Sequence, residues 1–391
     1  MTTYTRPEER LLLGPGPSNC HPRVLQALSS PTMGHLDAQF MAIMGECMDL
    51  MRLVFGSSHP VTIPVSGTGS AGMEASLVNF IEPNDRVVLG VAGLFGERMV
   101  DIAQRQGADV VQVKAPWGQA VDMDELEAAV KEAPTKLVGL VHAETSTGVY
   151  HDLKPLAELA SRHGALSMAD TVTSLGGMPV LVDELGLDIV YSGTQKCLSC
   201  PPGLAPLTVS PRALEVLHSR KEPVPSWYLD LTMISRYFGK ERFYHHTAPV
   251  NMIYALRESL MLIEEETLEA TWARHAENSR ALYAGLGALG LAPLPQPKER
   301  LNSLCVVRVP DGIDEAQVRA KLIKNYSMEI GGGLGELKGK VWRIGLMGYN
   351  SNVRNVNYCL TALGNELKAQ GCNVSVDAAL TEAAAHYTIP V

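Results

Sequence analysis

The sequence contains no run of about 18 consecutive apolar residues, so it predicts no transmembrane helix. Positive charge is in short supply, because 33 Lys and Arg stand against 42 Asp and Glu and leave a formal net charge of −9. That balance argues against nucleic acid or an anionic membrane as the main partner. The seven cysteines are scattered and odd in number, so they make no disulfide framework and favour a reducing compartment.

Neither end of the chain shows a targeting signal. The N-terminal stretch MTTYTRPEERLLLGPGPSN has acids and a proline where a signal peptide needs an unbroken apolar core. The C-terminal residues TIPV are not a peroxisomal tripeptide. We therefore expect a cytoplasmic protein.

What the chain does contain is a long alternation of strand-like and helical segments. Between about 61 and 210, short runs rich in Val, Leu and Ile alternate with amphipathic stretches such as LKPLAELASRHG. This alternation predicts an α/β fold with a mostly parallel sheet covered on both faces. The pattern changes after about residue 268, which indicates a smaller α+β domain. We predict an N-terminal arm at 1–22, a large domain at 23–267 and a small C-terminal domain at 268–391.

Polar residues follow several of the predicted strands. Sheets of this kind bind ligands beyond the carboxyl ends of their strands, so these residues should gather in one crevice. Lys196 stands out among them, because no other charged residue lies between Ile189 and Leu207. The set comprises Ser66 to Ser70 after VTIPV, Glu144 to Ser146 after LVGLVHA, Asp170 after GALSMA, and Gln195 with Lys196 after DIVYSG.

Each feature also has an ordinary structural interpretation. The loop SGTGSAG fits a plain N-cap turn, Asp170 fits a cap for the next element, and Lys196 fits a surface lysine. The stretch Gly67-x-Gly69-x-x-Gly72 also matches a dinucleotide fingerprint, which would suit an NAD(P)-dependent dehydrogenase. The next strand, VVLGV, ends without the acidic residue that this fingerprint requires, and we discount that interpretation.

A glycine-rich loop, a carboxylate and a lysine in one crevice are the groups that bind pyridoxal phosphate. A helix N-terminus after a glycine-rich loop can cradle its phosphate, a carboxylate keeps its pyridine nitrogen protonated, and a lysine holds its aldehyde as a Schiff base. Lysine suits the last role because its amine pKa falls readily in a desolvated site. The sequence therefore predicts pyridoxal 5'-phosphate as the cofactor.

Two further clusters could suggest a metal or redox site, but neither supports one. The segment CLSC at 197–200 has no second pair at metal spacing and no thioredoxin-like context, so its thiols are interpreted as incidental. The segment YHHT at 244–247 has two adjacent histidines, which should point apart on a strand. We predict no metal site.

The motifs, in their order, resemble the class V aminotransferases of pyridoxal-phosphate fold type I, and more closely the alanine–glyoxylate (serine–pyruvate) aminotransferase family. This resemblance covers nearly the whole chain. It implies a seven-stranded, mostly parallel sheet in the large domain, a smaller C-terminal domain, and a homodimer with sites shared between subunits. The motifs that carry it are LLLGPGPSN, SGTGSAGMEASLVN, HAETSTGV, ADTVTSLGG, YSGTQKCLSCPPG, FYHHTAPV and RIGLMG.

The resemblance also implies roles for single residues. Lys196 would form the Schiff base and move the substrate proton, and Asp170 would pair with the pyridinium nitrogen. Arg343 would bind the substrate carboxylate, with Gly16 and Thr145 lining the same side. The other implied contacts are Thr68, Gly69, Ser70 and Gln195 at the phosphate, Thr145 at the ring oxygen, Phe95 against the ring, and Tyr244 and Thr247 at the phosphate of the partner subunit's cofactor.

Two positions depart from the family pattern. Phe95 stands where the mammalian enzymes have tryptophan, and Ser70 stands where they carry histidine. Both substitutions are compatible with cofactor binding, but they leave the fine substrate preference open.

The predicted reaction is transamination between a small amino acid, alanine or serine, and a small 2-oxo acid, glyoxylate or pyruvate. Within class V, pyridoxamine–pyruvate aminotransferase and a cysteine desulfurase-like lyase remain alternatives. The lyases usually have a histidine before the lysine, where Gln195 stands here, and a nucleophilic cysteine for which the sequence offers no convincing candidate. A cofactor-binding regulator is a further alternative, which no DNA-binding segment supports.

Overall fold

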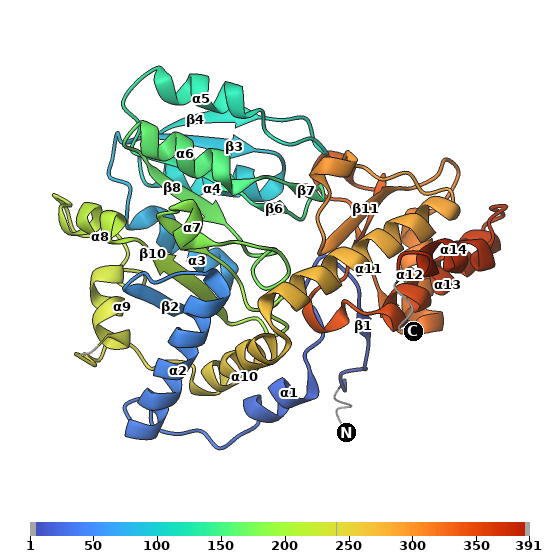
Figure 1. Cartoon of the computed structure of the whole chain (residues 1–391), viewed down its shortest axis with the longest axis horizontal. Coiled ribbons are helices and arrows are strands. Elements are labelled where there is room, and N and C mark those ends of the chain that lie inside the picture. The colour runs from blue at the N-terminus through green and yellow to red at the C-terminus, as the bar shows by residue number, and fades with distance from the viewer. Residues whose placement is uncertain (1–4, 240, 388–391) are drawn as a thin grey trace.

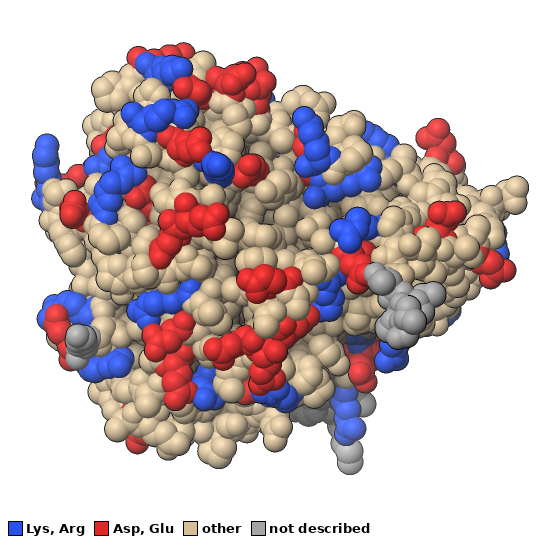
Figure 2. Space-filling view, in the orientation of Figure 1, with Lys and Arg blue, Asp and Glu red and all other residues tan. Residues whose placement is uncertain are grey.

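The computed structural model describes residues 5–239 and 241–387. The C-terminal residues TIPV, from which we expect no peroxisomal signal, lie outside these ranges. Figure 1 shows a larger body built around a central sheet and a C-terminal part beside it, with the N-terminal segment running between the two. On the face shown in Figure 2, acidic and basic side chains are interspersed rather than gathered into one basic patch.

The central sheet has seven strands in the order β2-β10-β9-β8-β5-β3-β4. Six of them run in one direction, and β10 is antiparallel to both of its neighbours. This confirms the predicted α/β fold with a mostly parallel, seven-stranded sheet. The strands are β2 (Val61–Ser66), β3 (Arg86–Val91), β4 (Asp109–Lys114), β5 (Leu137–Val141), β8 (Leu166–Asp170), β9 (Ile189–Tyr191) and β10 (Leu204–Val209).

The central strands β5, β8 and β9 are buried along their whole length. Parallel strands are buried in this way when helices cover the sheet. One pair, α3 and α4, packs together against the strands, and α5 and α6 form a second pair. The helices of this body are α1 (Pro22–Leu28), α2 (Ala38–Phe55), α3 (Gly69–Val78), α4 (Leu94–Arg105), α5 (Met123–Lys131), α6 (Leu153–Arg162), α7 (Val182–Leu185), α8 (Pro211–His218), α9 (Leu231–Phe238) and α10 (Val250–Glu266).

The C-terminal part begins with α11 (Leu268–Ala288), so the predicted division after residue 267 falls between α10 and α11. Its sheet has the order β11-β14-β13. Near the C-terminal end of the described residues, the alanine-rich helix α14 packs on α11. The elements are β11 (Leu304–Arg308), α12 (Glu315–Tyr326), β12 (Met328–Glu329), β13 (Gly331–Gly332), β14 (Val341–Gly345), α13 (Val353–Ala369) and α14 (Val376–Ala384).

The N-terminal segment is attached to the C-terminal part. The short strand β1 (Leu11–Leu12) pairs in parallel with β12, and Leu13 is buried in the C-terminal core. A small third cluster joins the two bodies, since it contains Ala143 and Cys197 of the large body together with Val341 of β14. The segment after β9 therefore packs directly against the C-terminal part.

None of the helices in the described ranges combines the length and the apolar character that crossing a bilayer would require.

Candidate active site

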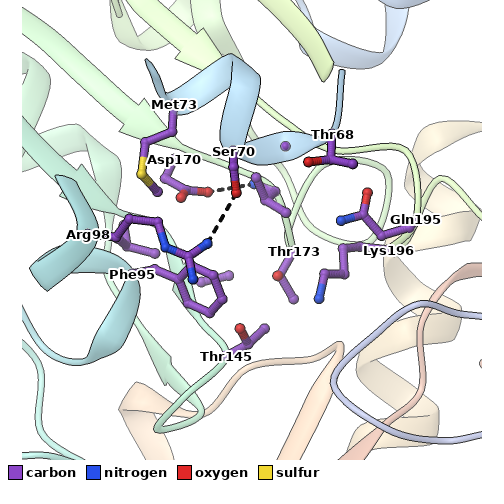
Figure 3. Close-up of a pocket in the computed structure, with 14 residues that line it drawn as sticks. Thr68, Ser70, Met73, Phe95, Arg98, Thr145, Asp170, Thr173, Gln195 and Lys196 are labelled. Carbon is purple, nitrogen blue, oxygen red and sulfur yellow. Dashed lines mark hydrogen bonds between the residues drawn. The ribbon is translucent and has the colours of Figure 1, made fainter. Parts of the chain in front are cut away.

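A pocket lies at the edge of the central sheet where the parallel strands end. In Figure 3, Gln195 and Lys196 enter it from one side, and Phe95 and Arg98 lie on the other. Eight of the predicted site residues line it. The lining residues are Thr68, Gly69, Ser70, Met73, Phe95, Arg98, Val141, Ala143, Thr145, Asp170, Val172, Thr173, Gln195 and Lys196.

Lys196 follows β9 and is buried, with 9% of its surface exposed. Burial, reinforced by the nearby Arg343 guanidinium, lowers the pKa of its amine from 10.5 to about 8. The Nζ atom donates a hydrogen bond to the carbonyl of Pro15. This lysine is therefore not a solvated surface residue, and its amine can lose its proton close to neutral pH.

The N-terminal segment holds the loop that carries Lys196. Ser18 donates through its backbone N–H to Gln195 O at 2.9 Å, and its hydroxyl donates to Lys196 O at 2.8 Å. Gly16 has φ +109°, and a Cβ there would lie 2.6 Å from Cδ of Lys196. Only glycine fits at this position without displacing the lysine side chain. Gly16 therefore lies against Lys196, although it is not a lining residue of the pocket.

Asp170 is the last residue of β8 and is 3% exposed. Its Oδ1 accepts a hydrogen bond from Val172 N at 2.8 Å, which is the local capping contact that the ordinary interpretation predicts. Its Oδ2 accepts from the Tyr191 hydroxyl at 2.7 Å, and the carboxyl group also lines the pocket. Burial raises its pKa from 3.8 to about 6, while these two hydrogen bonds act in the opposite direction.

The glycine-rich loop leads into the N-terminus of α3. Thr68 is the N-cap residue, but its side chain makes no capping hydrogen bond, so the loop is not an ordinary side-chain cap. A Cβ at Gly69 would lie 3.1 Å from Cγ2 of Val172. The close approach that glycine permits brings the free N–H groups of the first turn to the pocket wall, where they can bind an anion.

Gln195 gives a second indication that a polar group binds here. Its Oε1 is buried and has no hydrogen-bond partner among the described residues. A buried polar atom without a partner is costly in free energy, and a polar ligand in the pocket would remove that cost. The open helix N-terminus, the buried carboxylate and the buried lysine amine fit the phosphate, the ring nitrogen and the aldehyde of pyridoxal phosphate.

The sequence did not indicate how Phe95 is held. Glu144, in the short strand β6 (Ala143–Glu144), accepts hydrogen bonds at Oε2 from the backbone N–H groups of Phe95 (3.1 Å) and Gly96 (3.2 Å). Its Oε1 accepts from the N–H and the hydroxyl of Ser146. Burial raises the pKa of Glu144, and these donors oppose that shift. A fully buried carboxylate thus caps α4 and fixes its aromatic residue at the pocket.

Arg98, one turn after Phe95 on α4, is a second cation that the sequence analysis missed. Its guanidinium lies 4.9 Å from the centroid of the Phe95 ring, and NH1 donates to Ser70 Oγ at 3.1 Å. Figure 3 shows it pointing toward the start of α3. The spacing of three residues from Phe95 on a helix was the available signal.

Arg343, on β14, lies beside the pocket rather than in its lining. Its Nε donates to Gly332 O at 2.7 Å, and NH1 donates to Thr145 O at 3.1 Å. Burial lowers its pKa from 12.5 to about 10, while the nearby Glu144 carboxylate acts in the opposite direction. The guanidinium is therefore held next to Thr145, which is itself a lining residue.

Tyr244 and Thr247 lie outside the pocket, and both are exposed. The expectation that the two histidines between them point apart on a strand is wrong. The segment is an irregular loop, and Nδ1 of His245 lies 2.8 Å from Nδ1 of His246. His246 also bonds to Ser66 Oγ at 2.6 Å, which ties this loop to the end of β2.

The cysteines next to the lysine are buried thiols. Cys197 donates to Thr173 O at 3.2 Å, and burial raises its pKa to about 12. Burial also raises the pKa of Cys200. Within residues 5–239 and 241–387, no group of three or more His, Cys, Asp or Glu side chains is arranged to hold a metal ion.

The chain is similar to known proteins over most of its length. The family model described as aminotransferase class-V matches residues 11–352. The crystal structure of an alanine–glyoxylate aminotransferase from Nostoc sp. is 47% identical, with a TM-score of 0.92 over 94% of this chain and 97% of that one. The (S)-ureidoglycine–glyoxylate transaminase of Bacillus subtilis is 37% identical over 96% of this chain and 94% of its own length. A pyridoxamine–pyruvate aminotransferase from Mesorhizobium loti is 28% identical, with a TM-score of 0.93 over 98% of each chain.

Proposed function

The chain belongs to the aminotransferase class-V family and is a pyridoxal-phosphate-dependent aminotransferase, and we propose that it transfers an amino group from alanine or serine to glyoxylate or pyruvate. The observation that supports this most is the meeting of Lys196, Asp170 and the open end of α3 in one pocket, with Arg343 beside it. The names of the relatives support glyoxylate as the first acceptor to test.

In this proposal the residues of the pocket would hold the cofactor. Thr68, Gly69 and Ser70 at the start of α3, with Gln195, would bind the phosphate. Asp170 would pair with the ring nitrogen, and Phe95, held by Glu144, would form the wall against the ring. When bound, pyridoxal phosphate supplies an electron sink for the carbanion that forms when the substrate loses its Cα proton.

Lys196 moves that proton. Its Nζ accepts a proton from the substrate Cα as a general base and returns one as a general acid. An ordinary lysine amine would be almost fully protonated at neutral pH, but burial brings the pKa of Lys196 to about 8, so the neutral base is accessible. Asp170 would pair with the protonated ring nitrogen of the bound cofactor, because its carboxylate stabilises a positive charge.

Arg343 binds the substrate carboxylate. Two of its N–H groups are fixed on the carbonyls of Gly332 and Thr145, which holds the guanidinium in one orientation. The remaining donors can bind one carboxylate and orient the Cα–H toward Lys196. Arg98 is a second cation at the pocket, but it lies on the side of Ser70 and Phe95 rather than beside Thr145.

The class V alternatives have less support. A cysteine desulfurase-like lyase needs a reactive thiolate, whereas burial raises the pKa of Cys47, Cys197, Cys305 and Cys359 to about 12. Pyridoxamine–pyruvate transamination corresponds to a relative of lower identity than the glyoxylate-dependent ones.

We further propose a homodimer with shared sites. The loop that carries Tyr244 and Thr247 presents large exposed side chains, with Phe243 47% and Tyr244 54% exposed. The neighbouring Trp227 is 63% exposed. A monomer seldom exposes such aromatic residues together, and a partner subunit would cover them. Tyr244 and Thr247 would then reach the partner's cofactor phosphate.

A cytoplasmic location is the remaining part of the proposal. It is supported by the cysteines, since all seven are free thiols. Fractionation of the native host, with the protein followed by a specific antibody, tests it. Recovery in a membrane or secreted fraction would contradict the proposal.

The reaction is tested by assaying the purified enzyme against a matrix of donors and acceptors. Donors are alanine, serine and (S)-ureidoglycine, and acceptors are glyoxylate, pyruvate and 2-oxoglutarate. We expect the highest kcat/KM for glyoxylate with alanine or serine. A clear preference for (S)-ureidoglycine would show that the proposed donor is wrong and leave glyoxylate as the acceptor. An absence of glyoxylate turnover would overturn the proposal.

A further inference from the structure

Tyr191 is a buried tyrosine next to the proposed ring-nitrogen partner. It is the last residue of β9, and its cross-strand partner on β8 is Asp170. Its side chain has 0% exposure, and its hydroxyl donates to Asp170 Oδ2 at 2.7 Å. Among the described residues this is the one hydrogen bond that the hydroxyl makes.

The tyrosine ring is held in place by the packing of α3 on the sheet. A Cβ at Gly72 would lie 3.3 Å from Cβ and Cδ2 of Tyr191 and 3.0 Å from Cβ of Ala205. The third glycine of Gly67-x-Gly69-x-x-Gly72 thus leaves room for the ring of Tyr191. A ring enclosed in this way has little rotational freedom, so its hydroxyl stays directed at Asp170.

The Asp170 carboxylate is consequently bound at both oxygens. Val172 N–H binds Oδ1, and the Tyr191 hydroxyl binds Oδ2. The two donors restrict rotation of the carboxylate, and both favour its charged form because each donates a hydrogen bond to it.

The other charges around Asp170 come from three elements. Lys196 on the loop after β9 and Arg98 on α4 favour the charged form of Asp170. Glu144 on β6 is the nearby carboxyl group, and Asp170 contributes to raising its pKa, since two buried carboxylates repel each other. Burial is the largest influence and raises the pKa of Asp170 to about 6. At that value, the loss of one donor would change the fraction of Asp170 that is ionised near neutral pH.

We propose that Tyr191 is a positioning residue that keeps the Asp170 carboxylate charged and correctly oriented for the ring nitrogen of the cofactor. This proposal rests on the proposed role of Asp170. It gives the closely packed Gly72 and the buried tyrosine a shared purpose, which is to orient the carboxylate before the cofactor binds.

The test measures pyridoxal phosphate binding to the cofactor-free, full-length chain as a function of pH. In the wild type, affinity should rise as pH increases through the pKa of Asp170. Tyr191→Phe removes only the hydroxyl, and a hydrogen bond to a charged group corresponds to about one pKa unit or more. The midpoint of the rise should therefore move up by about one pH unit, which makes binding about fivefold weaker at pH 6 and nearly unchanged above pH 8.

Three further substitutions complete the experiment. Tyr237→Phe and Asp170→Asn are controls, and Gly72→Ala is a second test of the proposal. Tyr237→Phe removes another fully buried tyrosine hydroxyl, which donates to His35 O at 3.1 Å outside the pocket, and it should leave the midpoint unchanged. Gly72→Ala keeps Tyr191 but presses a methyl group on its ring, and it should move the midpoint in the same direction as Tyr191→Phe. Asp170→Asn should remove the rise centred near pH 6, while the dependence that comes from Lys196, whose pKa is about 8, should remain.

The outcomes distinguish a failure of the role of Tyr191 from a failure of the role of Asp170. If Asp170→Asn abolishes the rise but Tyr191→Phe binds the cofactor like the wild type at every pH, Tyr191 only fills the core and the inference is wrong. If Asp170→Asn itself binds like the wild type, the proposed role of Asp170 fails, and the role of Tyr191 fails with it.

Discussion

The carboxylate of Glu144 accepts the backbone N–H of Phe95 at 3.1 Å, although the two residues are separated by 49 positions in the chain. The same oxygen binds the N–H of Gly96, so the first turn of α4 depends on a side chain from β6. One wall of the pocket is therefore fixed by a buried carboxyl group that does not itself line the pocket.

Replacing Glu144 should therefore weaken cofactor binding and lower stability. In Glu144→Ala the N–H groups of Phe95 and Gly96 lose their buried acceptor, and each unsatisfied group costs about 1–3 kcal/mol. We expect a lower unfolding free energy and a higher cofactor dissociation constant. The exposed Glu184→Ala is the matched control in denaturation and binding experiments. Equal behaviour of the two variants would show that the cap is dispensable.

Asp170→Asn should reduce transamination by orders of magnitude while the fold stays intact. An amide carries no charge to keep the ring nitrogen protonated, and the cofactor then loses its function as an electron sink. Single-turnover kinetics with alanine measure this step directly. Near-normal turnover would mean that Asp170 serves only as the cap for Val172.

The same substitution should stabilise the cofactor-free protein above about pH 6. The pKa of Asp170 is raised from 3.8 to about 6 in the folded chain, so the folded state binds this proton more tightly than the unfolded state. Stability is therefore lost as pH rises through this window, by at most about 3 kcal/mol. Urea unfolding at pH 8 should favour Asp170→Asn over the wild type, and the difference should vanish near pH 4. If Asp170→Asn were less stable than the wild type at pH 8, the upward shift of the Asp170 pKa would be contradicted.

Much of this site was predictable because the carboxyl ends of parallel strands meet at one edge of a sheet. Asp170 and Lys196 end or follow neighbouring strands, so their meeting with the loop Gly67 to Ser70 follows from topology alone. Tyr191 was not predictable, because its contact with Asp170 depends on the register between β8 and β9. Glu144 was recognised as a polar residue at a strand end, but its partner on α4 lies far away in the chain.

The histidines show where local pattern reasoning fails. The expectation that His245 and His246 point apart assumes a strand, whereas the loop that carries them has no regular period. Their rings meet because His246 is anchored on Ser66 and His245 on the carbonyl of Trp227. Both anchors are tertiary contacts that no periodicity of the sequence encodes.

Shared sites in a homodimer are tested by complementation. We expect that Lys196→Ala and a chain carrying both Tyr244→Ala and Thr247→Ala are each inactive alone. Mixed and reassembled, they should recover roughly a quarter of the wild-type activity, because half of the dimers are mixed and each has one intact site. Native mass spectrometry verifies that mixed dimers form. Mixed dimers without activity would show that the sites are not shared.

In the proposed function, Arg343 is the main anchor for the substrate carboxylate and therefore decides substrate choice. The second carboxylate of 2-oxoglutarate would be desolvated without a partner unless Arg98 can reach it, which is unfavourable. We expect a higher kcat/KM for glyoxylate than for 2-oxoglutarate with one fixed donor, and a loss of at least tenfold for glyoxylate in Arg343→Ala, which corresponds to about 1.4 kcal/mol. Arg162→Ala is the control, because its guanidinium lies on the surface beside Glu127 and Glu158.

A preference for 2-oxoglutarate would show that a second basic group serves the substrate. Arg98→Ala would then identify it, if that variant lost 2-oxoglutarate turnover and kept glyoxylate turnover. Activity within a few-fold of the wild type in Arg343→Ala would mean that the anchor is misassigned.

The central claim, that Lys196 is the residue that binds and serves the cofactor, is tested most directly by chemical trapping. The purified holoenzyme is reduced with borohydride, digested, and analysed by mass spectrometry for a lysine that carries the reduced cofactor. We predict a single modified peptide, labelled at Lys196, and no label in Lys196→Ala although that variant still binds the cofactor through the start of α3. A label on any other lysine of the wild type would contradict the account.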